Sequence, residues 1–299
     1  MTMTDPTPAA PPRPANVGEK RRPADGFHPR SADPGEAAEP RLRARDLRLA
    51  YDSRVVVDGV TLDIPTGRTT VVVGPNGCGK STLLRGLGRL LKPRGGSVLL
   101  DGDEIGSLPT REVARRLGLL PQQPIVPEGV SVLELVERGR HPHHGLFGTW
   151  GRADEEAVAA ALERTDLVHL AGVPVDSLSG GQRQRVWLAM VLAQSTPVLL
   201  LDEPTSFLDI AHQLDVLDLV RSLCDEQGTT VVMVLHDLAM AARYADHLVA
   251  MRDGEVVAEG APAEVVTPEV IASVFGVAAH VIHDPETGTP VVIPRRRQQ

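Results

Sequence analysis

One stretch of this chain reads Gly74-Pro75-Asn76-Gly77-Cys78-Gly79-Lys80-Ser81-Thr82, and it has the form of a complete phosphate-binding P-loop. Its glycines let the backbone curl so that successive N–H groups face phosphate oxygens. Lys80 brings a positive charge to the β- and γ-phosphates, and the Ser81 hydroxyl is placed to bind Mg²⁺. The pattern predicts a triphosphate site, the alternative being a glycine-rich turn that matches by chance.

The residues on either side of the loop favour the phosphate site over the chance match. Thr69 to Val73 is a β-branched run that predicts a buried strand. Leucines recur at helical spacing after the loop, at Leu83, Leu84, Leu87, Leu90 and Leu91. A strand, a loop and a helix in this order place the phosphates at a helix N-terminus, where the peptide dipoles favour an anion.

The composition limits the class of protein. With 299 residues, the chain has room for one large or two small domains. It has 31 basic and 39 acidic residues, a net charge of −8, which argues against nucleic acid as the main partner. No apolar run approaches the roughly 18 residues that span a bilayer, and residues 1–40 lack the apolar region of a signal peptide. Cys78 and Cys224 are too few for a disulfide framework, so we expect a reducing cytoplasm.

Residues 1–40 differ in composition from the rest of the chain. They hold nine prolines and hardly any large apolar residue, so burial cannot offset the entropy of ordering them. We predict that this proline-rich segment is disordered and that a folded domain begins near Arg41. The triplet Lys20-Arg21-Arg22 is interpreted as a solvated charge run rather than a site for acidic headgroups.

The rest of the pattern predicts an α/β domain with a helical insert. Alternating and continuous apolar runs predict strands at 42–51, 55–64, 97–100, 198–201 and 230–235. Residues from about 110 to 173 are mostly helical in pattern, with a break rich in Pro and His near 141–151. A late hairpin is expected over 248–258, with its turn at Arg252-Asp253-Gly254.

An acidic pair follows one of the buried strands, in Val198-Leu199-Leu200-Leu201-Asp202-Glu203. Asp202 comes at the carboxyl end of the strand, where open α/β sheets bind ligands, and we expect it to reach Mg²⁺ through water. Glu203 is then placed to polarise the attacking water as a general base. Such a pair can equally cap a helix, and the P-loop upstream is what favours the catalytic interpretation.

A second helix start that could bind an anion, besides the one after the P-loop, has the sequence Leu178-Ser179-Gly180-Gly181-Gln182-Arg183-Gln184-Arg185. Ser179 is a good N-cap, and the two glycines expose backbone N–H groups before a helix that runs to Gln194. Taken alone, this is also an ordinary capped helix. The stretch matches the signature of ABC ATPases without a mismatch, and the chain resembles the nucleotide-binding subunit of an ABC transporter over residues 41 to about 294.

The resemblance implies an α/β fold of the P-loop NTPase class, an ABC cassette with a RecA-like core, an antiparallel β subdomain and a helical subdomain. It places the ABC ATPase domain at 41–277, with its helical subdomain at about 110–180. Residues 278–299 then form a C-terminal extension.

Four further positions match motifs of the family. Gln122 matches the glutamine that touches Mg²⁺ and links the ATP core to the helical insert, although Gln123 beside it leaves the register open. Leu208-Asp209 matches the D-loop, which crosses to the partner subunit, and His236 matches the switch histidine that contacts the γ-phosphate. Tyr51 matches the aromatic residue that stacks on adenine.

The resemblance thus implies a full set of site residues for ATP and Mg²⁺. The implied catalytic residues are Lys80, Glu203 and His236, and the implied metal-binding residues are Ser81, Gln122 and Asp202. The implied ATP-binding residues are Tyr51, Gly74, Pro75, Asn76, Gly77, Cys78, Gly79, Lys80, Ser81, Thr82, Gln122, Ser179, Gly180, Gly181 and Gln182.

The family geometry also explains why one chain carries two phosphate-binding helix starts. In the family, ATP lies between the P-loop of one subunit and the residues that match Ser179 and Gly181 in the other. The resemblance therefore implies a head-to-tail dimer of two copies with two composite sites. The γ-phosphate favours the closed dimer, and hydrolysis removes that preference.

Within the family, the chain looks like the ATPase subunit of bacterial ferric-siderophore importers of the enterobactin and hydroxamate type. The segments that carry this likeness are 136–143, 188–194, 234–238 and 284–290. It implies integral-membrane permease subunits as partners, an extracytoplasmic siderophore-binding protein as an indirect partner, and a peripheral place on the cytoplasmic face of the membrane.

Other functions within the family stay open. Cobalamin and haem importers share the same importer type, and an exporter with a separately encoded permease is a further alternative. Translation and repair ABC ATPases fit less well, because the chain has a single cassette and no coiled-coil insert.

The region from Gln123 to Trp150 is predicted to dock on the permease. Leu146, Phe147 and Trp150 are apolar residues on a polar, Gly-rich loop, a pattern that suits an interface, the alternative being that they cap the helical insert. The nearby cluster His141, His143 and His144 has no Cys or carboxylate at ligand spacing, so no metal site is assigned to it.

Three residues near the motifs receive a structural interpretation. Cys78 is interpreted as a small packing residue rather than a redox-sensitive point. Trp187 and Met190 are expected to be core residues of the helix that follows the signature.

Overall fold

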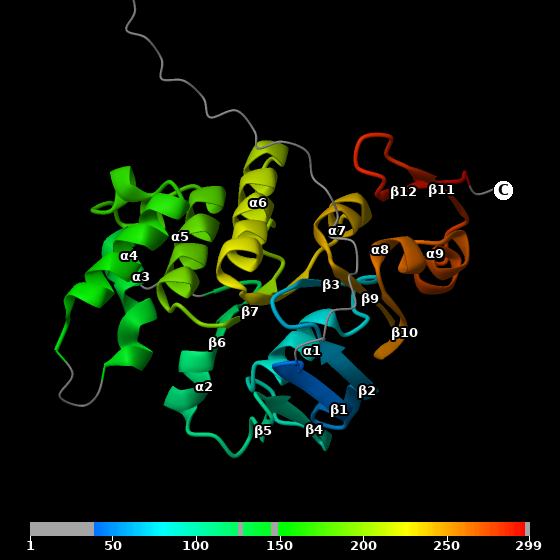
Figure 1. The fold of residues 1–299 in the computed structure, drawn as a ribbon, viewed down its shortest axis with the longest axis horizontal. Helices are drawn as coiled ribbons and strands as arrows, with labels where there is room; N and C mark the ends of the chain where they lie inside the picture. The colour runs from blue at the N-terminus through cyan, green and yellow to red at the C-terminus, as the bar shows by residue number, and fades with distance from the viewer. Residues whose placement is uncertain (1–38, 125–127, 145–148, 297–299) are drawn as a thin grey trace, which may run out of the picture.

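The structure is a computed structural model that describes residues 39–124, 128–144 and 149–296. A central sheet carries a second sheet against one face and a helical part at one end (Figure 1). The predicted α/β fold, with an antiparallel sheet and a helical part, is confirmed. The proline-rich segment predicted at 1–40 lies outside the described residues, apart from 39 and 40.

The central sheet has six strands in the order β10-β9-β3-β8-β7-β6, and only the pairing of β10 with β9 is antiparallel. Every residue of β3, β7 and β8 is buried, as continuous apolar runs covered on both faces predict. The bounds are β3 Thr69–Val73, β6 Leu117–Leu120, β7 Val198–Asp202, β8 Thr230–Val234, β9 His247–Arg252 and β10 Glu255–Gly260.

The second sheet is antiparallel, in the order β2-β1-β4-β5. Its strands are β1 Leu42–Tyr51, β2 Arg54–Ile64, β4 Gly95–Leu100 and β5 Asp103–Glu104. The first two agree closely with the predicted ranges.

The two faces of the central sheet pack against different layers, because successive side chains of a strand alternate. Val71 and Val73 join a core with α5 (Gly180–Ala193), α6 (Ile210–Gln227) and α7 (Leu238–Tyr244). Val72 faces the other way, into a core with α1 (Lys80–Leu87) and the antiparallel sheet. The P-loop therefore connects the middle of the sheet to a helix held between two layers.

The helical part has its own apolar core, built from α3 (Val132–Glu137), α4 (Arg152–Arg164) and α5. Its short 3-10 turns are η1 (Arg138–His143), η2 (Val168–Leu170) and η3 (Val175–Ser177). Helix α5 belongs to two cores at once, with Val186 and Ala189 in this one and Leu188 and Val191 in the core of the central sheet. It therefore joins the helical part to the core of the central sheet.

The range 110–180, predicted to be helical, also contains a strand of the central sheet. After α2 (Thr110–Arg116), the run Leu117-Gly118-Leu119-Leu120 forms β6, which pairs in parallel with β7. A four-residue apolar run next to a helix has no period of its own, so the sequence pattern could not separate it from that helix.

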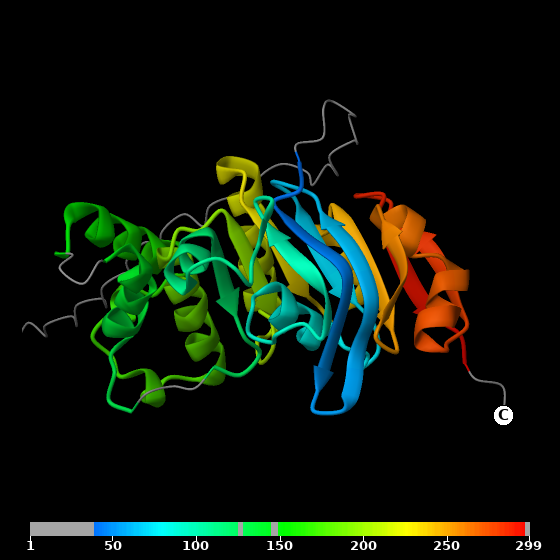
Figure 2. The ribbon, with the colours of Figure 1, turned by 90° about the horizontal axis from the view of Figure 1, so that it is seen from below.

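The C-terminal elements form the end opposite the helical part, as Figure 2 shows. They are α8 (Pro262–Val265), α9 (Pro268–Phe275) and a hairpin of β11 (Ala279–His283) with β12 (Pro290–Pro294). Ala279 is buried in the core with α7, and Val281 and Val292 pack against it, so the described part of the extension predicted at 278–299 lies on the core of the central sheet.

Two predicted core residues are only half-buried. Trp187 and Met190 pack against the core of the central sheet and against that of the helical part, without being enclosed by either. Across the described ranges, no helix has the length and apolar character needed to span a bilayer.

Candidate functional site

The P-loop holds the ammonium group of Lys80 inside its own turn. Lys80 is 5% exposed, and its Nζ donates to the carbonyl oxygens of Gly74 at 2.9 Å and Pro75 at 3.0 Å. Because Lys80 is the first residue of α1, its charge lies beside the free N–H groups of that helix. Charge and N–H groups together suit the phosphate chain of a nucleotide.

Two positions of the loop have room only for glycine, because the backbone of a neighbouring strand lies close to each of them. A Cβ at Gly74 would overlap the carbonyl oxygen of Met251 on β9. Gly79 has φ +107, and a Cβ there would lie 2.9 Å from the carbonyl oxygen of Val56 on β2. The loop is thus packed against both sheets, and a side chain at either position would push it out of place.

Ser81 and Asp202 bring a hydroxyl and a carboxylate together beside the loop. Ser81 Oγ donates to Asp202 Oδ1 at 2.9 Å, and Asp202, the last residue of β7, is 3% exposed. Burial raises the pKa of Asp202 above its ordinary value, against the hydrogen bond from Ser81. A buried carboxylate with a hydroxyl next to it is a donor set that fits a hard divalent cation such as Mg²⁺.

Glu203 is held at both carboxylate oxygens. Its Oε1 lies 2.6 Å from His236 Nε2, and its Oε2 accepts from Ser206 Oγ at 2.9 Å. Burial alone would raise the pKa of Glu203, but hydrogen bonds from His236, Gln122 and Ser206 outweigh it and lower the pKa. The group is therefore kept as a carboxylate, the form that accepts a proton.

The backbone at Glu203 is in the left-handed region, with φ +53. Residues other than glycine adopt this conformation rarely, and it is commonest where surrounding contacts impose it at functional sites. Here it turns the chain sharply between the end of β7 and the segment that leads to α6.

Most of the predicted catalytic and phosphate-binding residues line one cavity of about 330 Å³. Its walls are Val56, Asn76, Gly77, Gly79, Lys80, Ser81, Thr82, Gln122, Glu203 and His236. Gln122 lies here with Glu203, and it also lines a second hollow together with Gln123 and Trp187. Val56 and the Ser206 contact were not foreseen, because Val56 comes from β2 of the antiparallel sheet and the Ser206 contact depends on the left-handed backbone at Glu203.

The predicted signature residues lie on a separate cavity of about 340 Å³. Ser179 caps α5, since its Oγ accepts from Gln182 N at 3.2 Å while Gln182 Oε1 accepts from Ser179 N at 3.0 Å. The walls are Ser179, Gly180, Gly181, Gln182, Arg185, Phe207, Leu208, Asp209 and His212. The two cavities share no residue, so the described part of one chain does not bring the signature to its own P-loop.

The predicted D-loop lines this second cavity as an exposed turn. Asp209 caps α6, accepting from His212 N at 2.9 Å and lying 2.7 Å from His212 Nδ1. Phe207 is 76% exposed and Ile210 71%, a large apolar surface for a monomer to leave in water. His212 was not singled out from sequence, because a histidine in the first turn of a helix carries no signal by itself.

Tyr51 and Cys78, both predicted to bind ATP, are not among the walls of the P-loop cavity. Tyr51 is 40% exposed and is not among the cavity walls; its hydroxyl accepts from Arg85 Nη1 of α1 at 2.9 Å. Cys78 is 3% exposed, and burial raises the pKa of its thiol. A buried thiol with a raised pKa is unreactive, which fits the packing interpretation.

Described residues of the region predicted to dock on a permease line a hollow on the helical part. Its cavity of about 700 Å³ is lined by Gly129, Val130, Glu134, Glu137, Arg138, His141, His144 and Trp150. Trp150 is 41% exposed and stacks on His144, with ring centroids 5.5 Å apart. Leu146 and Phe147 lie outside the described residues.

Two of the three histidines of this region have different side-chain partners. His143 Nε2 lies 2.8 Å from the carbonyl oxygen of Gln194, and His144 Nε2 lies 3.5 Å from Asp154. Asp154 itself accepts from Arg140 at 2.9 Å, and this hydrogen bond lowers the pKa of the carboxyl group.

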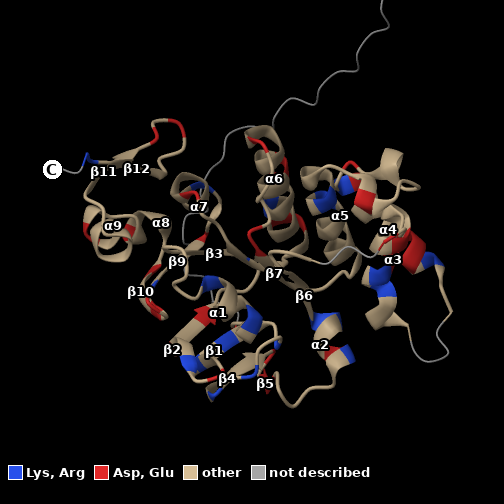
Figure 3. Ribbon diagram, turned by 180° about the vertical axis from the view of Figure 1, so that it is seen from behind, with Lys and Arg blue, Asp and Glu red and all other residues tan. Residues whose placement is uncertain are grey.

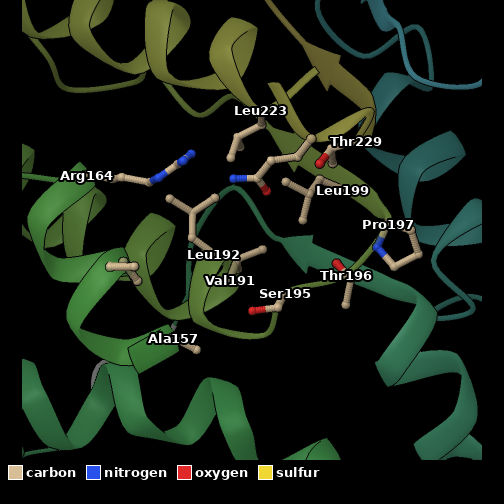
Figure 4. A pocket seen from close by; sticks show the side chains of 13 residues that line it. Ala157, Arg164, Val191, Leu192, Ser195, Thr196, Pro197, Leu199, Leu223 and Thr229 are labelled. Atoms are coloured by element: carbon tan, nitrogen blue, oxygen red, sulfur yellow. The ribbon is translucent and has the colours of Figure 1, made fainter. Parts of the chain in front are cut away.

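Another cavity, drawn in Figure 4, lies between α4, α5 and α6 and has a volume of about 330 Å³. Its walls include Arg164, Ser195, Thr229 and apolar residues such as Leu199 and Leu223. It contains none of the predicted site residues, and it lies next to the start of β7 and β8 rather than at their carboxyl ends. Ligands of α/β sheets bind at the carboxyl ends, where the P-loop cavity is.

Comparison with known proteins gives the chain's relatives. Residues 57–206 match the family model described as ABC transporter. The ferric enterobactin transport ATP-binding protein of Escherichia coli (strain K12) is 53% identical over 257 residues, covering 86% of this chain and 95% of that protein. A probable siderophore transport system ATP-binding protein of Bacillus subtilis (strain 168) is 53% identical over 256 residues, covering 86% of this chain and 93% of that protein. The cobalamin import ATP-binding protein of Halobacterium salinarum (strain ATCC 29341 / DSM 671 / R1) is 46% identical over 239 residues, covering 80% of this chain and 60% of that protein.

Solved structures of similar fold include two states of one bacterial cassette. The dimeric structure of this ABC transporter cassette has a TM-score of 0.67 at 30% identity, covering 74% of this chain and 98% of that one. A dimeric post-hydrolysis state bound to ADP and Pi has a TM-score of 0.66, again at 30% identity, with the same coverage.

Proposed function

Because this chain belongs to the ABC transporter family, we propose that it is the ATP-hydrolysing subunit that energises import of ferric siderophores through a membrane permease. The assignment as an ATP hydrolase is supported by one cavity whose walls include Lys80, Ser81, Gln122, Glu203 and His236. The assignment of ferric siderophores as the cargo is supported by the 53% identity to two siderophore-transport ATP-binding proteins over 86% of the chain.

The nucleotide is held by the P-loop and the residues around it. The backbone N–H groups of the turn from Gly74 to Thr82, which Pro75 alone lacks, and the Lys80 ammonium bind the phosphates, with Asn76 and Cys78 contributing through the backbone. Tyr51, exposed at the end of β1, offers its ring to the adenine, while its hydroxyl stays bound to Arg85.

Ser81, Asp202 and Gln122 are the residues that would hold Mg²⁺. Bound there, the ion would neutralise charge on the β- and γ-phosphates during transfer of the phosphoryl group to water. The raised pKa of buried Asp202 supports this, since a carboxylate that is costly to charge alone is stabilised by a cation.

Glu203 accepts the proton of the attacking water, and His236 orients Glu203 and senses the γ-phosphate. Glu203 is a carboxylate that can accept a proton, and its lowered pKa reflects the hydrogen bonds from His236, Gln122 and Ser206 that fix its position. Since the contact of 2.6 Å joins the two side chains, a phosphate that draws His236 aside would free Oε1 for the water.

The working form is a dimer of two copies arranged head to tail. The signature cavity has a capped helix start suited to an anion, yet it shares no residue with the P-loop cavity of its own chain. A second copy supplies the missing nucleotide, and Ser179, Gly180, Gly181 and Gln182 bind its γ-phosphate across a two-fold axis. The exposed Phe207 and Ile210 then become buried at this interface.

The permease subunits bind the hollow around Trp150 on the helical part, which places this subunit at the cytoplasmic face of the membrane. An extracytoplasmic siderophore-binding protein delivers the cargo to the permease and has no direct contact with this chain. Acidic and basic residues alternate along the helices and strands of the ribbon in Figure 3, which suits protein partners better than nucleic acid.

The cargo is tested by genetics. Deletion of the gene is expected to abolish growth on a ferric siderophore as sole iron source and to leave cobalamin uptake intact. The opposite phenotype, favoured by the 46% identity to a cobalamin import ATP-binding protein, would reassign the cargo and keep the hydrolase. Loss of haem uptake alone would reassign it to a haem importer.

A further inference from the structure

Gln184 carries a buried amide on the signature helix α5 that lines neither the P-loop cavity nor the signature cavity. It is 6% exposed, and its Nε2 donates to the carbonyl oxygen of Pro204 at 3.3 Å. Pro204 directly follows Glu203. In the proposed dimer, the first turn of α5 faces the nucleotide held by the partner's P-loop. The same helix is thus hydrogen-bonded to the backbone beside Glu203, the general base for the nucleotide held by its own P-loop.

The loop after Glu203 is short and internally bonded. Ser206 donates its backbone N–H to the Glu203 carbonyl at 3.2 Å and its hydroxyl to the Glu203 carboxylate at 2.9 Å. A shift of Pro204 would therefore move both the main chain and the side chain of Glu203. The left-handed φ of +53 at Glu203 leaves this turn little freedom to absorb such a shift elsewhere.

A second contact joins the same loop to the same helix turn. A Cβ at Gly181 would lie 3.0 Å from Leu208 Cδ2, so the signature glycine packs directly on the end of this loop. Gln213 Nε2 donates to the Leu208 carbonyl at 3.0 Å and holds that end against α6. The start of α5 and the loop 204–208 therefore form one packed unit with two attachment points.

We propose that Gln184 is a positioning residue that couples the signature turn to the orientation of Glu203 within the same subunit. Binding of the partner's nucleotide at Ser179 sets the position of α5, and the Gln184–Pro204 bond transmits that position to the base of the neighbouring composite site. This rests on the proposed dimer and on Glu203 as the base. It gives the signature motif a role in its own subunit besides the one across the interface.

The variant Gln184→Met keeps the length of the side chain and removes its donor. We expect kcat of the full-length protein to fall about tenfold with KM for ATP unchanged, because misplacing a catalytic group by about 1 Å costs up to about 10²-fold. The control is Gln194→Met, which removes an amide that donates to the Leu117 carbonyl from the other end of α5, and which is expected to keep kcat. A wild-type kcat in Gln184→Met would overturn the proposal.

A double-mutant cycle separates positioning from general damage. The cost of Gln184→Met is measured again in a Glu203→Gln background, from single turnovers of radiolabelled ATP. If Gln184 acts through Glu203, the second substitution adds no further loss. An equal tenfold loss in both backgrounds would show that Gln184 does not act through Glu203. Should Gln184→Met fold poorly, Gln184→Glu, which replaces the donor by an acceptor of the same length, enters the same cycle.

Mixed dimers test whether the effect stays within one subunit. Heterodimers purified through a different tag on each subunit, with Glu203→Gln in one subunit, keep both P-loops and both signatures and have one working general base. Gln184→Met added to the subunit that keeps Glu203 is expected to lower the remaining turnover about tenfold, and added to the Glu203→Gln subunit to leave it unchanged. The reverse pattern would overturn the proposal, whereas a starting heterodimer no faster than the Glu203→Gln homodimer would contradict Glu203 as the base.

Discussion

Nε2 of His236 lies 2.6 Å from Oε1 of Glu203, and the two side chains follow neighbouring parallel strands, β8 and β7. Residues beyond the carboxyl ends of adjacent parallel strands meet at one edge of the sheet, which is how positions 33 apart in sequence come into contact. The contact joins the residue expected to sense the γ-phosphate to the residue expected to activate water. Hydrolysis can in this way depend on the triphosphate being in place.

The first prediction concerns the general base. Glu203→Gln is expected to bind ATP with wild-type affinity and to hydrolyse it about 10²–10⁴ times more slowly, because the amide cannot accept the water proton. Size-exclusion chromatography with ATP should then show a stable dimer. Glu255→Gln, which changes an exposed carboxylate on β10, serves as the control. Near-normal turnover of Glu203→Gln would assign proton transfer to another group.

The second prediction concerns the composite sites. Ser179→Arg and Lys80→Ala are each expected to be inactive, and their equimolar mixture to recover activity up to about a quarter of wild type, the value for two sites of a dimer that work independently. Half of the dimers are then mixed, and each mixed dimer has one intact site. In the control mixture the Ser179→Arg subunit also carries Lys80→Ala, which leaves no intact site. Activity no greater than this control, in a sample where mixed dimers form, would contradict the head-to-tail arrangement.

The third prediction concerns stability. Arg221 donates to Asp246 at 2.9 Å, and both side chains are largely buried between α6 and the start of β9. Arg221→Met is expected to lower the free energy of unfolding by about 3 kcal/mol, because the Asp246 carboxylate stays buried and loses its charged partner. Urea unfolding measures the loss.

The matched control for Arg221 is an exposed ion pair. Arg152 donates to Glu156 at 2.7 Å, with 90% and 63% of the two side chains exposed. Arg152→Met is expected to cost less than about 1 kcal/mol, since solvent screens the pair. Equal losses for the two variants would mean that burial does not decide the strength of the Arg221 contact.

The parts of the site that the sequence predicts correctly are those encoded locally. The strand at 69–73, the P-loop and α1 are contiguous, so their residue types and spacing determine the geometry together. The cap at Ser179 is local as well, because donor and acceptor lie three residues apart. Asp202 and Glu203 could be placed because a strand end has a known position in an α/β sheet.

The contacts that the sequence does not predict join residues that are distant in sequence or lie in irregular loops. Gln184 reaches Pro204 only because α5 packs beside the loop after β7, and Arg85 reaches Tyr51 because α1 lies against the end of β1. Neither pair has a spacing that marks it. The Ser206 contact to Glu203 is short in sequence, yet it depends on the left-handed backbone at Glu203, which residue type does not predict.

The last prediction concerns docking on the permease. Trp150 is 41% exposed, stacks on His144 and forms one wall of the hollow that also contains Arg138 and His141. Large aromatic side chains that stay exposed on a monomer are typical anchors of protein interfaces. Trp150→Glu would place a charge in such an anchor position, so we expect it to weaken permease binding strongly.

The isolated subunit carrying Trp150→Glu should keep ATPase activity within about twofold of wild type, since a surface change away from the cavity disturbs stability little. In membranes or proteoliposomes with the permease, stimulated ATP turnover and siderophore uptake should both be lost. Val168→Glu is the control, because it puts the same charge at another apolar position of the helical part that is 58% exposed. Normal uptake with Trp150→Glu would remove this hollow as the docking surface, and equal defects in both variants would trace the loss to added charge rather than to a lost contact.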